Sequence, residues 1–251
     1  MAIGVIGVDS DAGIHYPDIL TTAKRSALPR IVRFWGRYFK GPNSVGGPQY
    51  SGDAEGRLFQ KENILLMPLA RQTNAVGGSR TLGSSLAKGN VDAFFQEVDV
   101  EHAVSASIAK ELLFFLDVEP GTDLSEDFYL GWSETLSSEA SRVTKGRIGF
   151  VPGVYLNRCN NKESVAVLNK IRNEGGYCAG LMVASYRTTD NPEEPVDWTT
   201  AHVSPSMATD IPILAWQYAA DRPPNKHLDY VQVNPDAKIQ EYLLSRLIVP
   251  A

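Results

Sequence analysis

The chain has 251 residues, of which 43% are hydrophobic and 21% charged, and its formal net charge is −5. This length allows a well-buried core, and the composition is that of a soluble globular protein rather than of a disordered chain. Its 24 basic residues are scattered among 29 acidic ones without a continuous positive stripe, which argues against binding to nucleic acid or to an anionic membrane surface.

The amino-terminal residues 1–9 lack the basic start and the long apolar core of a secretory signal. Their apolar character predicts a buried strand instead. No apolar run approaches the roughly 20 residues that a membrane-spanning helix requires. We therefore expect no membrane span. Because the chain shows no signal peptide, we expect a protein that is cytoplasmic as made or is exported by a route or leader not visible here.

Eight short runs of apolar, β-branched or aromatic residues predict eight strands. They occupy residues 3–9, 31–38, 62–69, 111–118, 147–155, 180–186, 211–217 and 228–233. Helical spacing marks the intervening residues 17–27, 86–108, 124–144 and 161–174. Alternation of strand and helix predicts a parallel sheet, and eight parallel strands close a barrel. The expected fold is therefore α/β, a single (β/α)8-like TIM barrel domain over residues 1–251, with any irregularity in the last strand–helix units.

A final helix at residues 236–247 is expected to close the outer ring of helices, with Ile239, Leu243 and Leu247 turned inward. Two connections rich in glycine or proline, residues 40–57 and 188–210, predict long loops. They follow the second and sixth strands, on the side where the active sites of barrels lie. We expect them to form walls of a cleft.

The fourth predicted strand ends in two carboxylates, Asp117 and Glu119. Side chains alternate along a strand, so both should project from one face with Val118 on the other. Two carboxylates brought together in a buried place raise at least one of their pKa values, which suits acid/base chemistry. The alternative is that Asp117 caps a helix while Glu119 is solvated where the strand ends.

Polar and aromatic side chains also occur near the ends of the other predicted strands. They are Asp9, Arg37, Tyr38, Arg71, Gln72, Tyr155, Tyr186, Trp216, Gln217, Tyr218 and Asp229. Sugars present polar edges and apolar C–H faces, so a polysaccharide site needs carboxylates for chemistry and flat rings to stack against. The predicted barrel mouth combines both.

Six short motifs occur in order along nearly the whole chain, and a seventh ends the second strand. They are Gly7-Val8-Asp9, Gly36-Arg37-Tyr38, Phe115-Leu116-Asp117-Val118-Glu119, Val154-Tyr155, Met182-Val183-Ala184-Ser185-Tyr186, Ala215-Trp216-Gln217-Tyr218 and Leu228-Asp229-Tyr230. In this ordered set the chain resembles the glycoside hydrolase family 25 lysozymes. It resembles more closely the uncharacterised glycoside-hydrolase-like family related to them, which the motif at Arg37 matches.

The resemblance implies a glycosidase that acts on a peptidoglycan-type polysaccharide of the cell wall, without metal or other cofactor. Glu119 would protonate the leaving glycosidic oxygen. Asp9, Asp117 and Asp229 would stabilise positive charge on the sugar or orient its acetamido group. The substrate-binding side chains would be Arg37, Tyr38, Gln72, Tyr155, Tyr186, Trp216 and Gln217.

The chain departs from the lysozyme pattern after Asp9, where it continues with Ser10 and Asp11, and at Val231, where the lysozymes usually have asparagine. Two other readings therefore stay open. One is a catalytically inactive barrel that binds glycan or a protein partner, and the other is an unrelated barrel enzyme with a small substrate. Which glycosidic bond would be cut, with which stereochemistry, and the oligomeric state are not determined by the sequence.

Several other features carry less chemistry. The two cysteines, Cys159 and Cys178, flank a predicted helix and are expected to be free thiols. The four histidines have no metal-binding spacing, although His15 could line the cleft. The glycine-rich residues 77–85 lack the ending of a phosphate loop, and Ser84 or Ser85 is expected to cap the next helix. Trp35 is expected to face outward against a helix.

Overall fold

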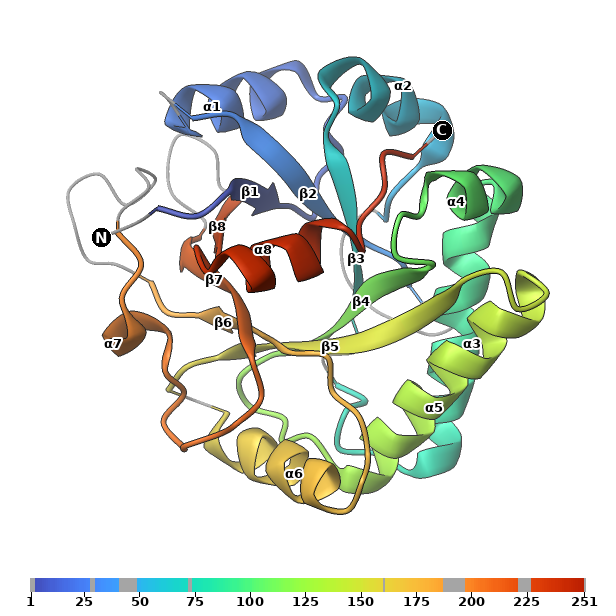
Figure 1. Cartoon of the computed structure of the whole chain (residues 1–251), viewed down its shortest axis with the longest axis vertical. Coiled ribbons are helices and arrows are strands. Elements are labelled where there is room, and N and C mark those ends of the chain that lie inside the picture. Colours follow the sequence, from blue (N-terminus) through green and yellow to red (C-terminus); the bar gives the residue numbers. More distant parts are fainter. Residues whose placement is uncertain are drawn as a thin grey trace.

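The computed structural model describes residues 3–27, 30–40, 49–71, 74–159, 161–186, 197–220 and 227–250. Within them, eight strands close into a barrel in sequence order (Figure 1). The strands are β1 (Ile6–Asp9), β2 (Val32–Tyr38), β3 (Leu65–Arg71), β4 (Glu111–Val118), β5 (Gly149–Asn157), β6 (Leu181–Ala184), β7 (Ile213–Ala219) and β8 (Asp229–Val233). Each overlaps a predicted strand, and the α/β barrel is confirmed.

The helices of the described residues alternate with the strands up to β7, and one more follows β8. They are α1 (Pro17–Ala27), α2 (Gly52–Glu62), α3 (Arg80–Glu97), α4 (Val100–Ala106), α5 (Glu126–Val143), α6 (Lys162–Asn173), α7 (Thr200–Val203) and α8 (Ala237–Leu244). Among these helices, none has the length and apolar character needed to cross a membrane.

The last strand breaks the parallel arrangement. Strands β1 to β7 pair in parallel along the sheet, whereas β8 is antiparallel to both of its neighbours, β7 and β1. The prediction of a fully parallel barrel is therefore wrong for one strand, and the irregularity lies in the last unit, as expected. The connection between β7 and β8 contains no helix in its described residues, so β8 can return directly beside β7 as in a hairpin.

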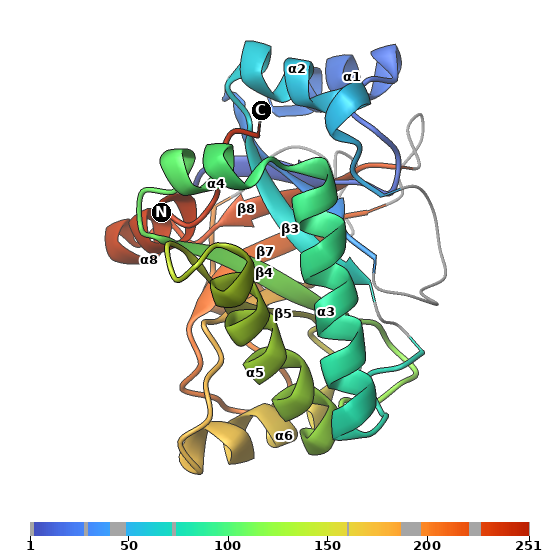
Figure 2. The same ribbon diagram turned by 90° about the vertical axis from the view of Figure 1, so that its right-hand side faces the viewer.

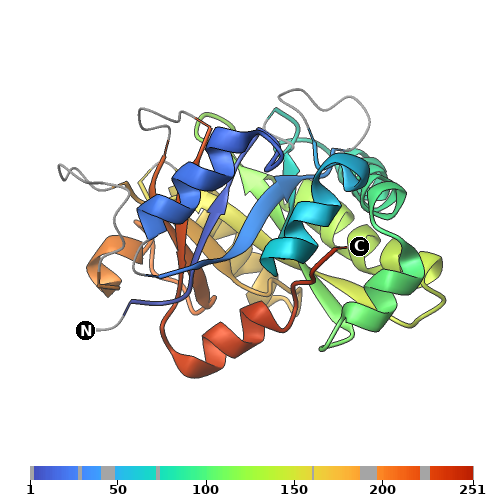
Figure 3. The ribbon, with the colours of Figure 1, turned by 90° about the horizontal axis from the view of Figure 1, so that it is seen from above.

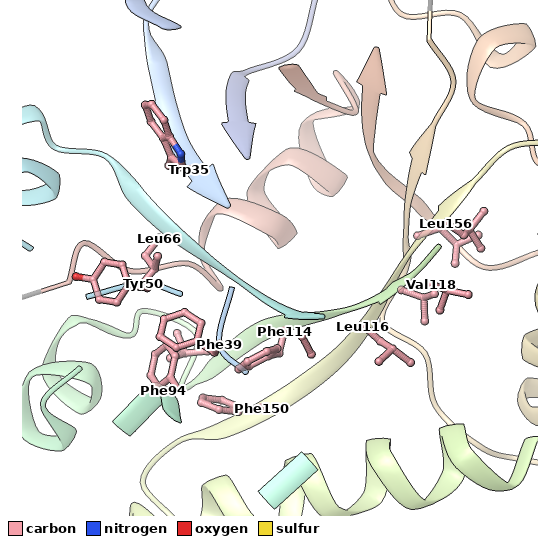
Figure 4. Close-up of a cluster of buried hydrophobic side chains, with 14 of the residues drawn as sticks. Trp35, Phe39, Tyr50, Leu66, Phe94, Phe114, Leu116, Val118, Phe150 and Leu156 are labelled. Carbon is pink, nitrogen blue, oxygen red and sulfur yellow. The ribbon is translucent and has the colours of Figure 1, made fainter. Parts of the chain in front are cut away.

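Two hydrophobic clusters follow from the alternation of side chains. Inside the barrel, Phe34, Leu113 and Phe115 belong to one cluster. On the outer face, Phe114 and Leu116 belong to a larger cluster that lies between strands and helices (Figure 4). Both faces of the strands are buried, which explains why β4 reads as an almost continuous apolar run.

Helices α3 and α5 lie side by side on the outside of the barrel (Figure 2). A Cβ at Gly83 would lie 2.2 Å from the backbone oxygen of Phe128, and a Cβ at Gly131 would lie 2.1 Å from that of Arg80. Glycine at these two positions therefore lets the helix backbones approach closely. Trp132 of α5 also donates a hydrogen bond to Asn90 of α3.

The predicted helix 86–108 is two helices, α3 and α4. Ser79, rather than Ser84 or Ser85, caps α3 by accepting a hydrogen bond from the backbone nitrogen of Leu82. Asp99 caps α4 in the same way. The side-chain oxygens of these caps stabilise two separate helix starts, which the helical spacing by itself does not reveal.

Two other boundaries differ from the predictions. Residues 52–57, predicted as loop, belong to α2, and α7 lies within the predicted loop 188–210. Glycine at the first position of α2 concealed the helix in the sequence, although acidic residues in its first turn favour a helix start. The cap of α5 at Ser125 is confirmed, and both cysteines are free, as predicted.

Helix α8 closes one end of the barrel instead of completing the outer ring (Figures 1 and 3). Leu243 and Leu247 belong to the cluster inside the barrel, with Ile239 packed against it. Arg246, which follows α8, pairs with Glu111 at the start of β4. The predicted inward residues are thus correct, but the helix covers the end at which strands β1 to β7 begin and leaves the opposite end, here called the mouth, free of α8.

Candidate active site

A pocket of about 170 Å³ lies at the mouth of the barrel. Its lining residues come from the ends of the strands and the residues that follow them. They are Asp9, Tyr38, Leu69, Asp117, Glu119, Tyr155, Met182, Tyr186, Gln217, Ala220 and Asp229. All four predicted carboxylates therefore line one pocket, together with three of the predicted tyrosines and Gln217.

The two carboxylates of β4 share one face, as the alternation of the strand predicts. Asp117 and Glu119 line the pocket, whereas Val118 between them packs in the outer hydrophobic cluster. Asp117 is buried, and Glu119, one residue beyond the end of β4, is partly exposed. The pocket thus has a buried acid and a more accessible acid from the same strand end.

Asp229 reaches the pocket because β8 is antiparallel. It is the first residue of β8 and pairs directly with Asp9, the last residue of β1. In a parallel strand a first residue would lie at the closed end of the barrel, beside α8. The direction of β8 therefore brings the fourth carboxylate to the mouth.

Asp9 is buried beside other acids, and each of them opposes its ionisation. Burial raises the pKa of Asp9 well above its usual value, and the charges of Asp229, Asp117 and Glu119 and a hydrogen bond with Asp229 raise it further. Within the described part of the chain, Oδ2 of Asp9 is buried without a hydrogen-bond partner. The protonated form of Asp9 is therefore favoured.

Asp117 is in a similar environment, with one opposing influence. Burial raises its pKa well above the usual value, Glu119 and Asp229 raise it further, and the guanidinium of Arg71 lowers it. Neither of its carboxylate oxygens has a hydrogen-bond partner among the described residues. Arg71 ends β3 and also lies over the ring of Tyr38, with its guanidinium carbon 5.3 Å from the ring centre.

Polar contacts link three of the predicted substrate-binding residues. The hydroxyl of Tyr155 donates a hydrogen bond to Oε1 of Gln217 at 2.6 Å, and Tyr186 approaches the same oxygen at 3.5 Å. Tyr155 and Gln217 are buried, and Tyr186 is exposed at the rim. The amide of Gln217 is thus oriented by Tyr155, which fixes the polar groups that the pocket presents.

Two of the predicted substrate-binding residues do not line this pocket. Arg37 projects from the outer face of β2 and pairs with Glu55 of α2, so the structure corrects its predicted place at the mouth. Trp216 is also on the outer face, where it packs beside Trp198 and donates to the backbone oxygen of Ser185. Gln72 lies outside the described residues.

The sequence reasoning did not single out Leu69, Met182 or Ala220 as lining residues, although they contribute the apolar part of the wall. Leu69 could have been found from strand parity, because it stands two residues before Arg71 and so shares its face. His15, a candidate for the cleft, is exposed, and its ring is tilted by 30° against that of Tyr16 with the ring centres 4.4 Å apart. Trp35 is on the outer face, as predicted.

The carboxylates of the pocket are not arranged as a metal site. Within the described residues, no group of three or more histidine, cysteine, aspartate or glutamate side chains is placed to hold a metal ion. What the pocket offers chemically is proton transfer and electrostatic stabilisation, since buried acids with raised pKa values lie beside an accessible carboxyl group.

The fold is a closed eight-stranded barrel whose mouth holds carboxylates and tyrosines. No family model and no curated protein matches the chain. Among solved structures, an uncharacterized protein of B. stearothermophilus shares the fold at 19% sequence identity and a TM-score of 0.70, over 97% of this chain and 100% of that chain.

Two further solved structures share the fold. The spore cortex lytic enzyme SleM of Clostridium perfringens is 14% identical with a TM-score of 0.56, over 94% of this chain and 68% of that chain. GHIP of Streptococcus pneumoniae is a glycosyl hydrolase 25 and a virulence factor participating in host cell invasion. It is 16% identical with a TM-score of 0.57, over 98% of this chain and 94% of that chain. At these identities the likenesses show a distant glycosyl hydrolase 25-like fold.

Proposed function

We propose that this chain is a single-domain glycoside hydrolase that cleaves a peptidoglycan-type polysaccharide. The observation that carries the proposal is that Asp9, Asp117, Glu119 and Asp229 line one pocket, together with three tyrosines. Carboxylates supply the proton transfer and charge stabilisation that glycoside cleavage needs, and the aromatic rings offer faces for sugar C–H groups.

In this proposal Glu119 is the general acid. It follows the end of β4 and is partly exposed, so it can reach a glycosidic oxygen that leaves toward solvent while the sugar occupies the pocket. Asp9 and Asp117 lie deeper, where burial makes an ionised carboxylate costly. Positive charge that develops on the sugar in the transition state offsets that cost, so these acids bind the transition state better than the ground state.

The substrate class rests on the fold neighbours and on the lining of the pocket. One neighbour, SleM, is a spore cortex lytic enzyme, which supports a wall polysaccharide as the polymer. Tyr38, Tyr155 and Tyr186 would contact the sugar, and the oriented amide of Gln217 would hydrogen-bond to one of its polar groups.

The test is release of reducing sugars and of muropeptides from purified peptidoglycan by the wild type and by Glu119→Gln. We expect release by the wild type and a loss of at least about a hundredfold in the variant, the size of a general-acid contribution. Glu134→Gln is the control, because Glu134 is an exposed residue of α5 that pairs with Arg80. It should leave release unchanged.

Wild-type activity in Glu119→Gln would reject the assignment of the acid. Release by neither protein, with both retained on the polymer in a pull-down, would instead identify a catalytically inactive glycan-binding barrel. Absence of both release and retention would reject both glycan cleavage and glycan binding, and would favour a protein partner or a small substrate.

A further inference from the structure

Behind the pocket, on the outer face of β2, lies a fully buried ion pair. Arg37 Nε donates to Glu55 Oε2 at 2.9 Å and Arg37 Nη2 donates to Glu55 Oε1 at 2.9 Å. The two side chains are 0% and 1% exposed. The pair is bidentate, so it fixes the orientation of α2 relative to β2 as well as their separation.

The same two side chains also hold backbone groups of the segment that follows Asp9. Arg37 Nη1 donates to the backbone oxygen of Ser10 at 2.6 Å, and Glu55 Oε2 accepts from the backbone nitrogen of Ile14 at 2.9 Å. The pair therefore binds both ends of residues 10–14, which connect β1 to the approach of α1. It does so from the side of the strand opposite the pocket.

Ser10 is held at its other polar atoms by residues adjacent to Arg37 on β2. Its backbone nitrogen donates to the backbone oxygen of Gly36 at 3.3 Å, and its hydroxyl accepts from Trp35 Nε1 at 2.7 Å. That hydroxyl in turn donates to the backbone oxygen of Ala12 at 2.7 Å. The peptide after Asp9 is thus fixed by three consecutive residues of β2.

A buried ion pair is a poor way to stabilise a fold, because desolvation of the two charges offsets much of their attraction. Its usefulness lies in geometry. We infer that Arg37 and Glu55 are positioning residues that set the place of the Asp9 carboxyl group in the pocket; the inference rests on the proposed function for its catalytic consequence. They act through the backbone of residues 10–14 and touch no substrate.

The position of Asp9 matters because its surroundings are crowded with titratable groups. Those that act on it or are acted on by it are Tyr38 on β2, Asp117 and Glu119 from β4, Tyr155 on β5, Tyr186 after β6 and Asp229 on β8. Interactions among charges at such short range change steeply with distance. A shift of Asp9 by about 1 Å is enough to alter both its ionisation and its fit to a transition state.

The primary test is Arg37→Lys, which keeps the charge but cannot donate to Glu55 and Ser10 in the same fork geometry. The matched control is Arg246→Lys, which changes another Arg–Glu pair at the closed end of the barrel, beside Glu111. Three quantities are measured on each protein: the midpoint of thermal unfolding, the titration of Asp9 followed by carboxyl ¹³C NMR, and kcat and KM on peptidoglycan.

In Arg37→Lys we expect the pKa of Asp9 to fall toward its ordinary value by about one unit, because the carboxyl group becomes less well buried. We expect kcat to fall about tenfold or more with KM little changed, the size that a misplacement near 1 Å allows. Arg246→Lys should change neither. An unchanged titration of Asp9 in folded Arg37→Lys would reduce the pair to a purely structural role and overturn the inference.

A second variant covers the case in which Arg37→Lys does not fold. Arg37→Met combined with Glu55→Met removes both charges together, a change that buried pairs often tolerate. The same shift in the titration of Asp9 is expected, and its absence would overturn the inference. The two proposals fail separately: a wild type without activity rejects the hydrolase, whereas the titration of Asp9 tests the positioning role without any substrate.

Discussion

Asp9 and Asp229 lie directly opposite each other, the last residue of β1 paired with the first residue of β8 across an antiparallel register. The charge of Asp229 and a hydrogen bond between the two side chains both raise the pKa of Asp9. Strand direction, which is a property of the fold, thereby sets the protonation of a residue in the pocket.

The free energy of unfolding should decrease as the pH rises. Asp9 and Asp117 have folded-state pKa values well above the ordinary value of 3.8. The folded protein therefore binds more protons than the unfolded chain, so this stabilising contribution is complete below the unfolded pKa and is lost as the pH passes through the folded pKa. Urea unfolding measured from acidic to mildly alkaline pH checks this.

Asp117→Asn should flatten that pH dependence and stabilise the protein at neutral pH. The raised pKa of Asp117 reports the energetic cost of a buried carboxyl group without a hydrogen-bond partner among the described residues, and removing that cost should raise the free energy of unfolding by about 1–3 kcal/mol. The control is Glu134→Gln on the exposed surface of α5, which should leave the slope unchanged. A slope in Asp117→Asn equal to that of the wild type would contradict the role of Asp117.

Gly36→Ala should destabilise the protein and disturb the pocket. A Cβ at Gly36 would lie 2.5 Å from the Cβ of Asp9 and 3.0 Å from Leu69 Cδ1, so Asp9 must move. We expect a loss of about 1–3 kcal/mol in the free energy of unfolding and a loss of any hydrolase activity. Gly149→Ala is the matched control in β5, because a Cβ there meets nothing within 4 Å. Equal stability of the two variants would show that the space beside Asp9 is not needed.

Gly131→Ala should separate α3 from α5. The added Cβ would lie 2.1 Å from the backbone oxygen of Arg80, which cannot move as a side chain can. We expect a loss of about 2–3 kcal/mol, at the upper end of the usual cost of overpacking. Ser137→Ala, an exposed position on the same helix, should change stability by no more than about 0.5 kcal/mol. A thermal unfolding midpoint of Gly131→Ala equal to the wild type would contradict the close packing.

Tyr155→Phe should release the amide of Gln217. The variant removes a buried hydrogen bond of 2.6 Å and leaves Oε1 of Gln217 with the longer contact to Tyr186. The expected cost is about 1–2 kcal/mol in the free energy of unfolding, together with weaker retention on the polysaccharide. The control is Tyr177→Phe, since Tyr177 is 53% exposed and its hydroxyl contacts that of Tyr242 away from the pocket. Chemical denaturation and pull-down on peptidoglycan measure both effects.

Much of the pocket could be predicted from strand periodicity. The period of two places Asp117 and Glu119 on one face, and the structure has both in the pocket. The same rule explains why Arg37 and Trp216, predicted at the pocket, lie on the outer face of the barrel. Each stands next to a pocket residue, Tyr38 or Gln217, and adjacent residues of a strand face opposite sides. Strict use of parity would have assigned both to the outer face.

Helix boundaries were less predictable, because spacing records which face is apolar and not where the chain turns. The break between α3 and α4 depends on the cap at Asp99, and the start of α3 depends on the cap at Ser79. A serine or an aspartate can also stand on the exposed face within a helix, so its presence in the sequence does not by itself mark a helix start. The local hydrogen bond decides, and it forms only when the backbone has already turned.

The sequence by itself determined the number of strands, their order, the apolar faces of β4 and the strand-end places of Asp9, Asp117 and Glu119, because these follow from local periodicity and residue type, whereas Asp229 reaches the mouth only through the direction of β8. The direction of β8, the place of α8 across the closed end and the pairing of Arg37 with Glu55 were decided only by the tertiary structure. A strand reads the same in either direction, and a buried charge has no local signal for its partner. Only the closed barrel, in which each strand edge must be paired and each buried charge balanced, selects among these arrangements.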